Sequence, residues 1–421
     1  MITTKYRARK EWFGYELFDR IDGRVIPLDQ VQSERIALLH SSGTRNEFMN
    51  RVSLPGLFND HEIAIEYPVD TPYAKTREFA SAPRRIYWEL TRRCNLNCRA
   101  CFNRFFPDRN ELSGREILSI AEDLYAAGVY EIRCTGGEPT MRPDFFELAE
   151  ELSRMGFYLS MGSNGCYSDT TLRKVIDAPL DWIILSMDGS DEKTFAESRG
   201  HNVYRRVLNT LEAVAGAGKR IRVNTLVRKN NYTYAHLKDL AVICDRFGVE
   251  SLNCIPLRPV FNDPGMLSMQ LSRKEFREFI QGLNTLRQEH RVDFVTTLDL
   301  RHTVEHDRVY YKDKSCAAGR EGAVLSPYGE LYGCSYSLAS DPDAPEEKRG
   351  RYVAGNILDE DFLAIWNDSA RWAIYRDLDR YKHDTCKACE YYSAKKCIGN
   401  CPIMDKDKPG AFDPYCYLFI D

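Results

Sequence analysis

The sequence predicts an α/β fold centred on a partial (β/α)6 TIM-like barrel, and three observations lead to it. Strand-like and helix-like segments alternate six times between residues 84 and 256. The 421 residues are 43% hydrophobic and 29% charged, a globular balance, and their length suits about three domains. Seven of the fourteen cysteines lie in the last quarter of the chain. We therefore expect three parts, at residues 1–80, 81–300 and 301–421.

The first 80 residues predict a small winged-helix domain followed by a linker. Segments 12–18 and 25–28 alternate like two strands, and the turn residues between them predict a β-hairpin. Two helices at 31–40 and 45–52 and a returning strand at 62–67 complete the expected unit. Prolines in the polar stretch that follows place the boundary near residue 80.

Residues 81–300 predict the barrel itself. Ser113 with Glu116, and later Ser272 with Glu275, form capping boxes that open two helices. Repeated right-handed crossovers curl a parallel sheet into a full or partial barrel, and ligands bind at the carboxyl ends of its strands. The six predicted strands are 86–90, 130–135, 158–163, 182–187, 221–227 and 251–256.

Charge and hydropathy exclude several classes of function. The 58 Lys and Arg residues against 62 Asp and Glu give a formal charge of −4, so there is no basic field for nucleic acid. No apolar run approaches the roughly 20 residues that span a membrane, and the first residues lack the apolar core of a signal peptide. We expect a cytoplasmic protein that binds neither nucleic acid nor membrane, with cysteines that are not paired as disulfides.

Three cysteines follow the first predicted barrel strand. Cys94, Cys98 and Cys101 are separated by three and then two residues. Thiolates this close suit a soft metal site, and three of them leave one position of a tetrahedral or cubane centre free for a ligand that is not protein. A zinc knuckle is the alternative, but it usually needs a fourth ligand, and the nearest histidines are His61 and His201.

This motif, with Phe102 directly after it, resembles the signature of the radical S-adenosylmethionine superfamily. The resemblance implies that the three cysteines hold a 4Fe-4S cluster whose open iron binds S-adenosylmethionine. It further implies reductive cleavage of that cofactor to a 5′-deoxyadenosyl radical, which removes hydrogen from an unactivated C–H bond. The cofactor would carry the chemistry, and the protein would position it.

Further segments at the ends of the predicted strands resemble the cofactor site of this family. The Gly-Gly-Glu-Pro run after the second strand matches the motif for the cofactor's amino group, although alone it also fits a simple turn. Arg199 is a candidate partner of the cofactor carboxylate, with a solvated surface residue as the alternative. The resemblance implies cofactor-binding roles for Phe102, Gly136, Gly137, Glu138, Asn164, Ser186, Asp188, Arg199, Asn224 and Leu257.

Seven cysteines lie in residues 301–421, and their paired spacing alone would fit structural zinc ribbons. With the flanking segments 355–357 and 364–367, the pattern resembles the SPASM extension of radical S-adenosylmethionine enzymes, which binds two auxiliary iron–sulfur clusters. The resemblance assigns three cysteines to the nearer cluster, whose fourth ligand stays open, and four to the distal cluster. The two sets are Cys316, Cys334 and Cys401, and Cys386, Cys389, Cys397 and Cys416.

The other cysteines and the residue after Cys334 refine this picture. Sulfatase-maturing relatives carry an Asp where this chain has Ser335, which argues against formylglycine formation. The remaining cysteines lie in apolar patterns, so we expect buried small hydrophobic residues at these positions. They are Cys134, Cys166, Cys244 and Cys254.

Residues 10–66 resemble the PQQ-chaperone-like recognition domain of enzymes that mature ribosomally made peptides. The resemblance implies that a leader peptide adds as a strand to the hairpin edge; a unit that only packs on the barrel is the alternative. We therefore expect an enzyme that modifies a peptide, by crosslinking, thioether formation, excision or decarboxylation. Its external electron donor would be a protein such as flavodoxin or ferredoxin. The alternatives are maturation of a protein or of a tetrapyrrole or quinone precursor, and a non-catalytic iron–sulfur or zinc interaction protein.

Overall fold

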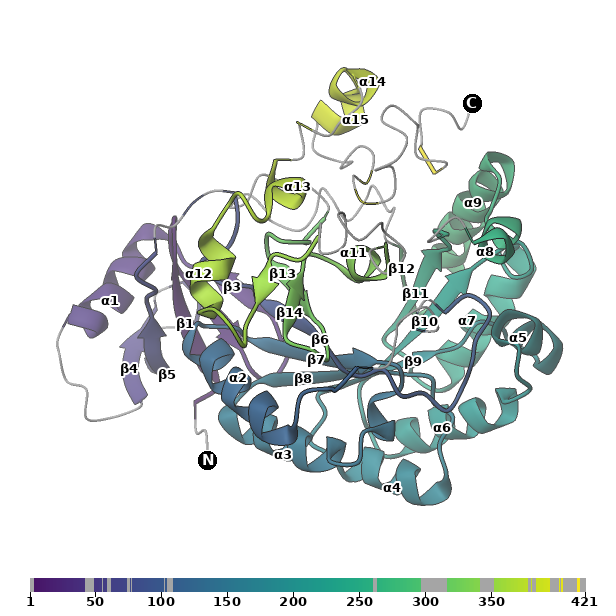
Figure 1. Cartoon of the computed structure of the whole chain (residues 1–421), viewed down its shortest axis with the longest axis horizontal. Helices are drawn as coiled ribbons and strands as arrows, with labels where there is room; N and C mark the ends of the chain where they lie inside the picture. The colour runs from purple at the N-terminus through teal and green to yellow at the C-terminus, as the bar shows by residue number, and fades with distance from the viewer. Residues whose placement is uncertain are drawn as a thin grey trace.

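The computed structural model describes residues 4–41, 49–54, 56–58, 62–73, 76, 78–101, 103, 109–259, 263–296, 316–340, 352–377, 380, 384–393, 401, 403 and 415–416. Within these residues the chain forms a five-stranded sheet near its amino terminus and a ten-stranded sheet that begins at Arg85 (Figure 1). Two predicted site residues, Phe102 and Cys397, lie outside the described residues.

The amino-terminal sheet has the strand order β3-β2-β1-β5-β4, and helix α1 packs on it. The predicted hairpin is confirmed, because β2 and β3 pair antiparallel. The predicted strand at 62–67 is confirmed as part of β5. The elements of this unit are β1 (Tyr6–Glu11), β2 (Gly14–Asp19), β3 (Val25–Pro27), α1 (Gln30–Ser41), β4 (Met49–Ser53) and β5 (Glu62–Val69).

The structure corrects the sequence prediction for this unit in two places. The predicted helix at 45–52 is wrong for residues 49–52, which belong to β4 and pair with β5; residues 45–48 lie outside the described residues. Val52 is buried in the sheet core, so cross-strand packing outweighs the local helical pattern. Strand β1 was not predicted, because its alternate residues Arg7, Arg9 and Glu11 are charged and give no apolar periodicity. In the structure all three are buried.

The predicted barrel strands are confirmed, and they pair in parallel in chain order. They are β6 (Arg85–Thr91), β7 (Glu131–Gly136), β8 (Tyr158–Ser163), β9 (Trp182–Ser186), β10 (Ile221–Val227) and β11 (Ser251–Pro256), and the unpredicted β12 (Asp293–Val295) pairs in parallel with β11. The helices are α2 (Gly114–Ala126), α3 (Phe145–Met155), α4 (Asp169–Asp177), α5 (Glu192–Arg199), α6 (Tyr204–Gly216), α7 (Tyr234–Arg246), α8 (Pro264–Met269) and α9 (Arg273–Glu289). Both predicted capping boxes are present, at α2 and α9.

The carboxyl-terminal region extends the barrel sheet beyond β6. Strand β13 (Gly322–Leu325) pairs in parallel with β6, and β14 (Glu330–Tyr332) and β15 (Gly355–Asn356) follow antiparallel. Buried Trp366 packs here and donates from its ring nitrogen to the Ala80 carbonyl at 2.8 Å. The described helices are α11 (Ser335–Ser340), α12 (Phe362–Asn367), α13 (Ala373–Arg376), α14 (Asp384–Lys387) and α15 (Glu390–Ser393).

The amino-terminal sheet docks at the amino-terminal ends of the barrel strands. The Arg7 guanidinium donates to the Val129 carbonyl and the Arg9 guanidinium to the Gly128 carbonyl, both at 2.9 Å, and both carbonyls lie just before β7. The first cysteine cluster follows the opposite, carboxyl end of β6. The amino-terminal unit and the cysteine loop therefore lie at opposite ends of the barrel.

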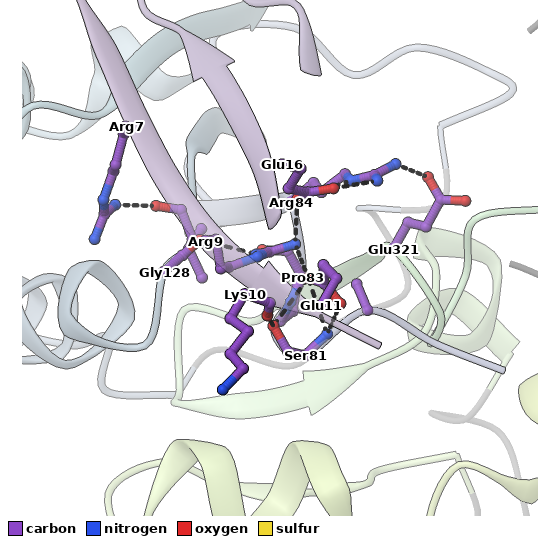
Figure 2. A network of polar contacts seen from close by, with 12 residues as sticks. Arg7, Arg9, Lys10, Glu11, Glu16, Ser81, Pro83, Arg84, Gly128 and Glu321 are labelled. Atoms are coloured by element: carbon purple, nitrogen blue, oxygen red, sulfur yellow. Dashed lines mark hydrogen bonds and ion pairs between the residues drawn. The ribbon is translucent and has the colours of Figure 1, made fainter. Parts of the chain in front are cut away.

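A buried ionic network joins all three regions of the chain (Figure 2). The Glu16 carboxylate on β2 accepts from Arg9 at 2.9 Å and from Arg84 at 2.5 Å, and Arg84 also donates to Glu321 beside β13 at 3.0 Å. Burial alone would raise the pKa of Glu16, but the guanidinium groups of Arg84 and Arg9 hold it below its usual value. A buried carboxylate is tolerated here because both of its oxygens are paired.

No helix in the described part of the chain is long and apolar enough to cross a membrane.

Candidate functional site

The cysteine loop leaves β6 with its three thiols half-buried. Asn164 donates to the Cys94 sulfur at 3.8 Å, and Arg199 donates to the Cys98 sulfur at 3.9 Å. The pKa of Cys101 is raised to about 11, mainly by burial, with smaller contributions in the same direction from the neighbouring Cys98 and Cys94 thiols. The loop thus places three thiols in one another's electrostatic field, with hydrogen-bond donors aimed at two of the sulfurs.

The Gly-Gly-Glu-Pro segment at the end of β7 is bound directly to this loop. The backbone N–H groups of Gly137 and Glu138 donate to the carbonyls of Thr91 and Arg93, both at 2.8 Å. A Cβ atom on Gly136 would lie 2.3 Å from the Thr91 oxygen, and one on Gly137 would lie 2.2 Å from the Arg93 oxygen. The glycines are therefore required by the close approach of two backbones, and their role toward a cofactor stays a prediction.

The Glu138 carboxylate is fully buried and occupied by protein donors. It accepts from the Ser163 hydroxyl at 2.9 Å, from the Asn164 backbone N–H at 2.8 Å and from the Thr140 hydroxyl at 3.0 Å. Burial raises the pKa of Glu138, and these donors oppose the rise. Glu138 consequently links the carboxyl ends of β7 and β8, and it holds Asn164 beside Cys94.

Asp188, after β9, organises the other side of the site. Its carboxylate contacts Arg199 at 2.8 Å and Arg228 at 2.9 Å, and it accepts from the Leu226 backbone N–H at 2.8 Å. The Asp188 carbonyl accepts from Asn231 at 2.9 Å. Arg199 therefore bridges Asp188 and Cys98, so it belongs to the site and is not a solvated surface residue.

Three further predicted residues lie at neighbouring strand ends. Ser186 is in register with Asn224 on β10, and the Asn224 side-chain oxygen accepts from Asn253 on β11 at 3.2 Å. The Leu257 backbone N–H donates to the Val227 carbonyl at 2.9 Å, and the Leu257 carbonyl accepts from the Tyr415 hydroxyl at 2.5 Å. The fold thus brings these predicted residues to the end of the barrel that carries the cysteine loop; their roles toward a cofactor stay predictions.

Among the described carboxyl-terminal cysteines, three lie near one another and two others flank a single turn. The pKa of Cys334 is raised to about 12, mainly by burial and in smaller part by the Cys401 and Cys316 thiols, so these three lie near one another. Cys386 and Cys389 flank one turn, in which the Cys389 N–H donates to the Cys386 carbonyl at 3.1 Å. Cys416 is half-buried.

Thiol chemistry fits iron–sulfur clusters at both places, since clustered thiolates are the ligands such clusters take. Among the described residues, no three His, Cys, Asp or Glu side chains form a preformed site for a metal ion. The predicted burial of the four remaining cysteines is confirmed, with exposed fractions of 0% for Cys134, Cys244 and Cys254 and 5% for Cys166.

Comparison with protein families agrees with this arrangement. A model of the radical SAM superfamily matches residues 88–242, and a model of the SPASM iron–sulfur cluster-binding domain matches residues 316–390. The chain belongs to the radical S-adenosylmethionine enzymes that carry a SPASM domain. Its cofactors are those of that family: S-adenosylmethionine, a 4Fe-4S cluster and auxiliary iron–sulfur clusters.

Two kinds of curated relatives are similar to this radical SAM enzyme along most of its length. Mycofactocin maturase MftC of Mycobacterium ulcerans is 26% identical over 326 residues, which is 76% of this chain and 83% of the relative. The AdoMet-dependent heme synthase of Oleidesulfovibrio alaskensis is 25% identical over 352 residues, which is 80% of this chain and 87% of the relative.

Solved structures share the fold. Streptococcus suis SuiB, crystallised with its precursor peptide SuiA, superposes with a TM-score of 0.73 at 17% identity and covers 99% of both chains. The structure of anSMEcpe with bound AdoMet and a peptide has a TM-score of 0.62 at 20% identity, and the match covers 79% of this chain and 94% of that one. The SuiB likeness therefore includes the amino-terminal unit of this radical SAM enzyme.

Sequence reasoning missed several residues that build the site. Arg228 and Asn231 hold Asp188, and Ser163 holds Glu138, but each pair is far apart in sequence. Arg228 is the first residue after β10, so its place at a strand end was the available signal. No local motif marks the pairing itself, because the partners meet only through the fold.

Proposed function

We propose that this radical SAM enzyme modifies a ribosomally made precursor peptide. The observation that carries the proposal is the fold likeness to SuiB over 99% of the chain, since SuiB was crystallised with a precursor peptide. The similarity to mycofactocin maturase supports the same class of substrate. A division of labour at residues 1–80, 81–300 and 301–421 is part of the proposal.

Within this proposal the protein residues bind and orient. Bound together, the loop cluster and S-adenosylmethionine supply reductive cleavage of the cofactor and removal of a hydrogen atom from a C–H bond. Cys94, Cys98 and Cys101 would hold the cluster, and the Asp188–Arg199 pair beside Cys98 would orient the cofactor. The two groups of SPASM cysteines would hold auxiliary clusters that accept the remaining electron or bind substrate.

The proposal is tested by anaerobic co-expression with each short peptide encoded beside the gene, followed by intact mass measurement. A loss of two hydrogens would identify a crosslink or thioether, and a larger loss would identify excision or decarboxylation. The same peptide without its leader is the control. Peptides of unchanged mass, with 5′-deoxyadenosine still formed, would contradict the proposal.

Leader recognition is assigned to the outer edge of β3, the end strand of the amino-terminal sheet. The Leu28 N–H and the Arg24 C=O form hydrogen bonds with β2. Because hydrogen-bonded residues alternate along an antiparallel strand, the N–H and C=O of Val25 point away from β2. An added strand would use these groups. Val25→Pro removes the outward N–H and should weaken leader binding in fluorescence anisotropy, while Val25→Ala keeps it; equal affinity of both variants would refute the assignment.

An external electron donor, such as flavodoxin or ferredoxin, is assigned to the surface over the cysteine loop. Asn95, Asn97 and Arg99 are exposed on that loop, so an electron can enter there over a short distance. Exposed Arg206 lines a cavity of about 520 Å³ together with Asn95. Neither arginine forms an ion pair with a carboxylate in the described part of the chain, which suits an acidic partner.

Substitution of Arg206→Glu tests this surface. We expect a higher KM for flavodoxin and unchanged S-adenosylmethionine cleavage when dithionite supplies the electron. Arg246→Glu, on the exposed end of α7 at the opposite rim, is the matched control. Flavodoxin kinetics that are alike in the two variants would place the donor elsewhere.

A second candidate is maturation of a tetrapyrrole, because the AdoMet-dependent heme synthase relatives align over as much of the chain as the peptide maturases do. Tetrapyrroles absorb visible light, so a spectral titration of the full-length protein separates the candidates. Binding of a tetrapyrrole without binding of any neighbouring peptide would favour this second candidate.

We also propose that the protein works in a reducing compartment such as the cytoplasm. All cysteines among the described residues are free of disulfide bonds, and the cluster ligands must stay reduced to bind iron. Alkylation mapping of thiols in intact cells measures this directly.

A further inference from the structure

The inner wall of the barrel is polar and cationic. Along each barrel strand, alternate residues are mostly apolar and buried in the main core, as are Ile132, Ile183 and Val223. The intervening residues face the inside of the barrel, because side chains alternate between the two faces of a sheet. Tyr87, Arg133, Ser160 and Trp182 lie in one row across β6 to β9. Arg222 and Ser251 are in register with each other on β10 and β11, and Arg222 is in register with Ile184 on β9.

The charges on this wall do not balance. Glu131 pairs with Arg85 and, at 3.0 Å, with Arg133, and it also accepts from the Ser160 hydroxyl at 2.8 Å. Arg222 brings a third guanidinium from β10, across the barrel from β6 and β7. Glu89 on β6 also faces inward but is paired with Arg92 at 2.6 Å. Three arginines therefore face one remaining carboxylate, whose oxygens Arg85 and Arg133 already occupy.

Arg222 is held in place but lacks a counter-ion. Its Nε donates to the Ser251 hydroxyl at 2.7 Å, and its guanidinium lies 5.0 Å from the centre of the Trp182 ring. It forms no salt bridge among the described residues. Burial lowers the pKa of Arg222, and repulsion from Arg133 and Arg85 lowers it further.

A second polar group beside Arg222 also lacks a partner. The Asn253 side-chain oxygen is buried without a hydrogen bond in the described structure, and Asn253 is the next inward residue after Ser251 on β11. Asn224, which the family resemblance places at the cofactor ribose, lies two residues above Arg222, or roughly 6–7 Å along the strand. A group that binds Arg222 would thus lie just beneath the cofactor, where a substrate must be held.

We propose that Arg222 binds a carboxylate of the substrate inside the barrel, while Asn253 accepts a substrate N–H. The carboxylate is either an acidic side chain or the terminal carboxylate of the peptide. The inference rests on the proposed function, because it names the chemistry of the peptide segment that the barrel admits. An arginine whose two terminal nitrogens donate no hydrogen bond among the described residues suits a carboxylate, which it can bind through two parallel hydrogen bonds.

The test measures binding without turnover, on the full-length, cluster-loaded protein with S-adenosylmethionine. The probes are two acid and amide pairs: N-acetylglutamate α-amide with N-acetylglutamine α-amide, and N-acetylglycine with N-acetylglycinamide. Saturation-transfer NMR measures their affinity. Phenylglyoxal modification of Arg222, mapped by mass spectrometry, reports occupancy of the site in the wild-type protein.

We expect the acid of at least one pair to bind about tenfold or more tightly than its amide and to protect Arg222. Preference for N-acetylglycine would identify a terminal carboxylate, and preference for the glutamate probe an acidic side chain. Arg222→Gln should abolish the acid preference, and Arg222→Lys should retain part of it.

Equal affinity of acids and amides, or equal protection of Arg222 by chloride at the same ionic strength, would overturn the proposal. The wild-type footprint keeps it falsifiable if a variant fails to fold. Because no peptide modification is measured, failure of the proposed function and failure of this site give different results.

Discussion

At the scale of single residues, Cys101 tests whether the loop holds a catalytic cluster. Its thiol lies among those of Cys94 and Cys98, so Cys101→Ala leaves two ligands on the loop. We expect lower iron and sulfide content and no 5′-deoxyadenosine when dithionite and S-adenosylmethionine are supplied. Cys134→Ala, at a fully buried thiol on β7, is the control and should keep both. Full cleavage by the Cys101 variant would contradict the assignment.

Asp181, before β9, gives a prediction about pH. Its pKa is raised to about 6, mainly by burial and in part by Glu131, against the opposing effects of the Leu159 N–H, Arg220 and Lys219. A carboxyl with a raised folded-state pKa stabilises the fold when protonated, and this stability is lost as pH rises from about 4 to about 6.

Asp181→Asn stays neutral and should therefore be more stable than the wild type above pH 6, by on the order of 2 kcal/mol. Urea unfolding at pH 4 and pH 8 measures the difference. The same gap at both pH values would show that Asp181 does not titrate in this range.

The cysteine motif and the glycine motif could be read from sequence because each is a local spacing. Their purpose could not, since Gly137 faces the Arg93 backbone and Glu138 faces Ser163, contacts that only the folded chain creates. The same limit hid Arg228, whose meaning depends on Asp188 forty residues away. Site residues that share a short motif can be predicted from sequence, whereas contacts between residues at the ends of different strands cannot.

At the scale of elements, the contact between the β7 end and the cysteine loop fixes the geometry of the site. Gly137→Ala places a methyl group 2.2 Å from the Arg93 carbonyl, which must displace one of the two loops. We expect weaker cluster binding, seen as a lower iron content and reduced absorbance of the cluster. Gly216→Ala, on α6 with nothing within 4 Å, is the control and should be neutral or stabilising.

Elements were predictable where apolar periodicity decides them. The six barrel strands have buried apolar faces against helices, and α2 and α9 begin at capping boxes, so both were found. Strand β1 buries arginines and a glutamate, and β4 depends on pairing with β5, so neither pattern was visible locally. The SPASM strand β13 adds to β6 from more than two hundred residues away, which no local pattern records.

At the scale of the whole molecule, the amino-terminal unit docks at one end of the barrel and the cysteine loop lies at the other. A leader bound to β3 would therefore leave the following peptide to run along the barrel before it reaches the cofactor. Glu16 and Arg84 connect the amino-terminal unit to both the barrel and Glu321, so under the proposed function their network would set where that path begins.

The last prediction concerns this network. Glu16→Ala leaves the buried guanidinium of Arg9 and the partly buried guanidinium of Arg84 without their shared acceptor. Removal of one partner from a buried ion pair costs about 3–5 kcal/mol, and this is an upper bound here because Arg9 keeps Glu11 and Arg84 keeps Glu321. We expect a lower free energy of unfolding, faster proteolysis between residues 70 and 80, and loss of leader-dependent modification, while S-adenosylmethionine cleavage without peptide persists. Glu192→Ala is the control, because its partner Arg205 is 84% exposed and such pairs contribute about 0–1 kcal/mol. Equal unfolding energies for the two variants would mean that apolar contacts such as the Phe18–Tyr130 stack, rather than the ionic network, hold the amino-terminal unit on the barrel.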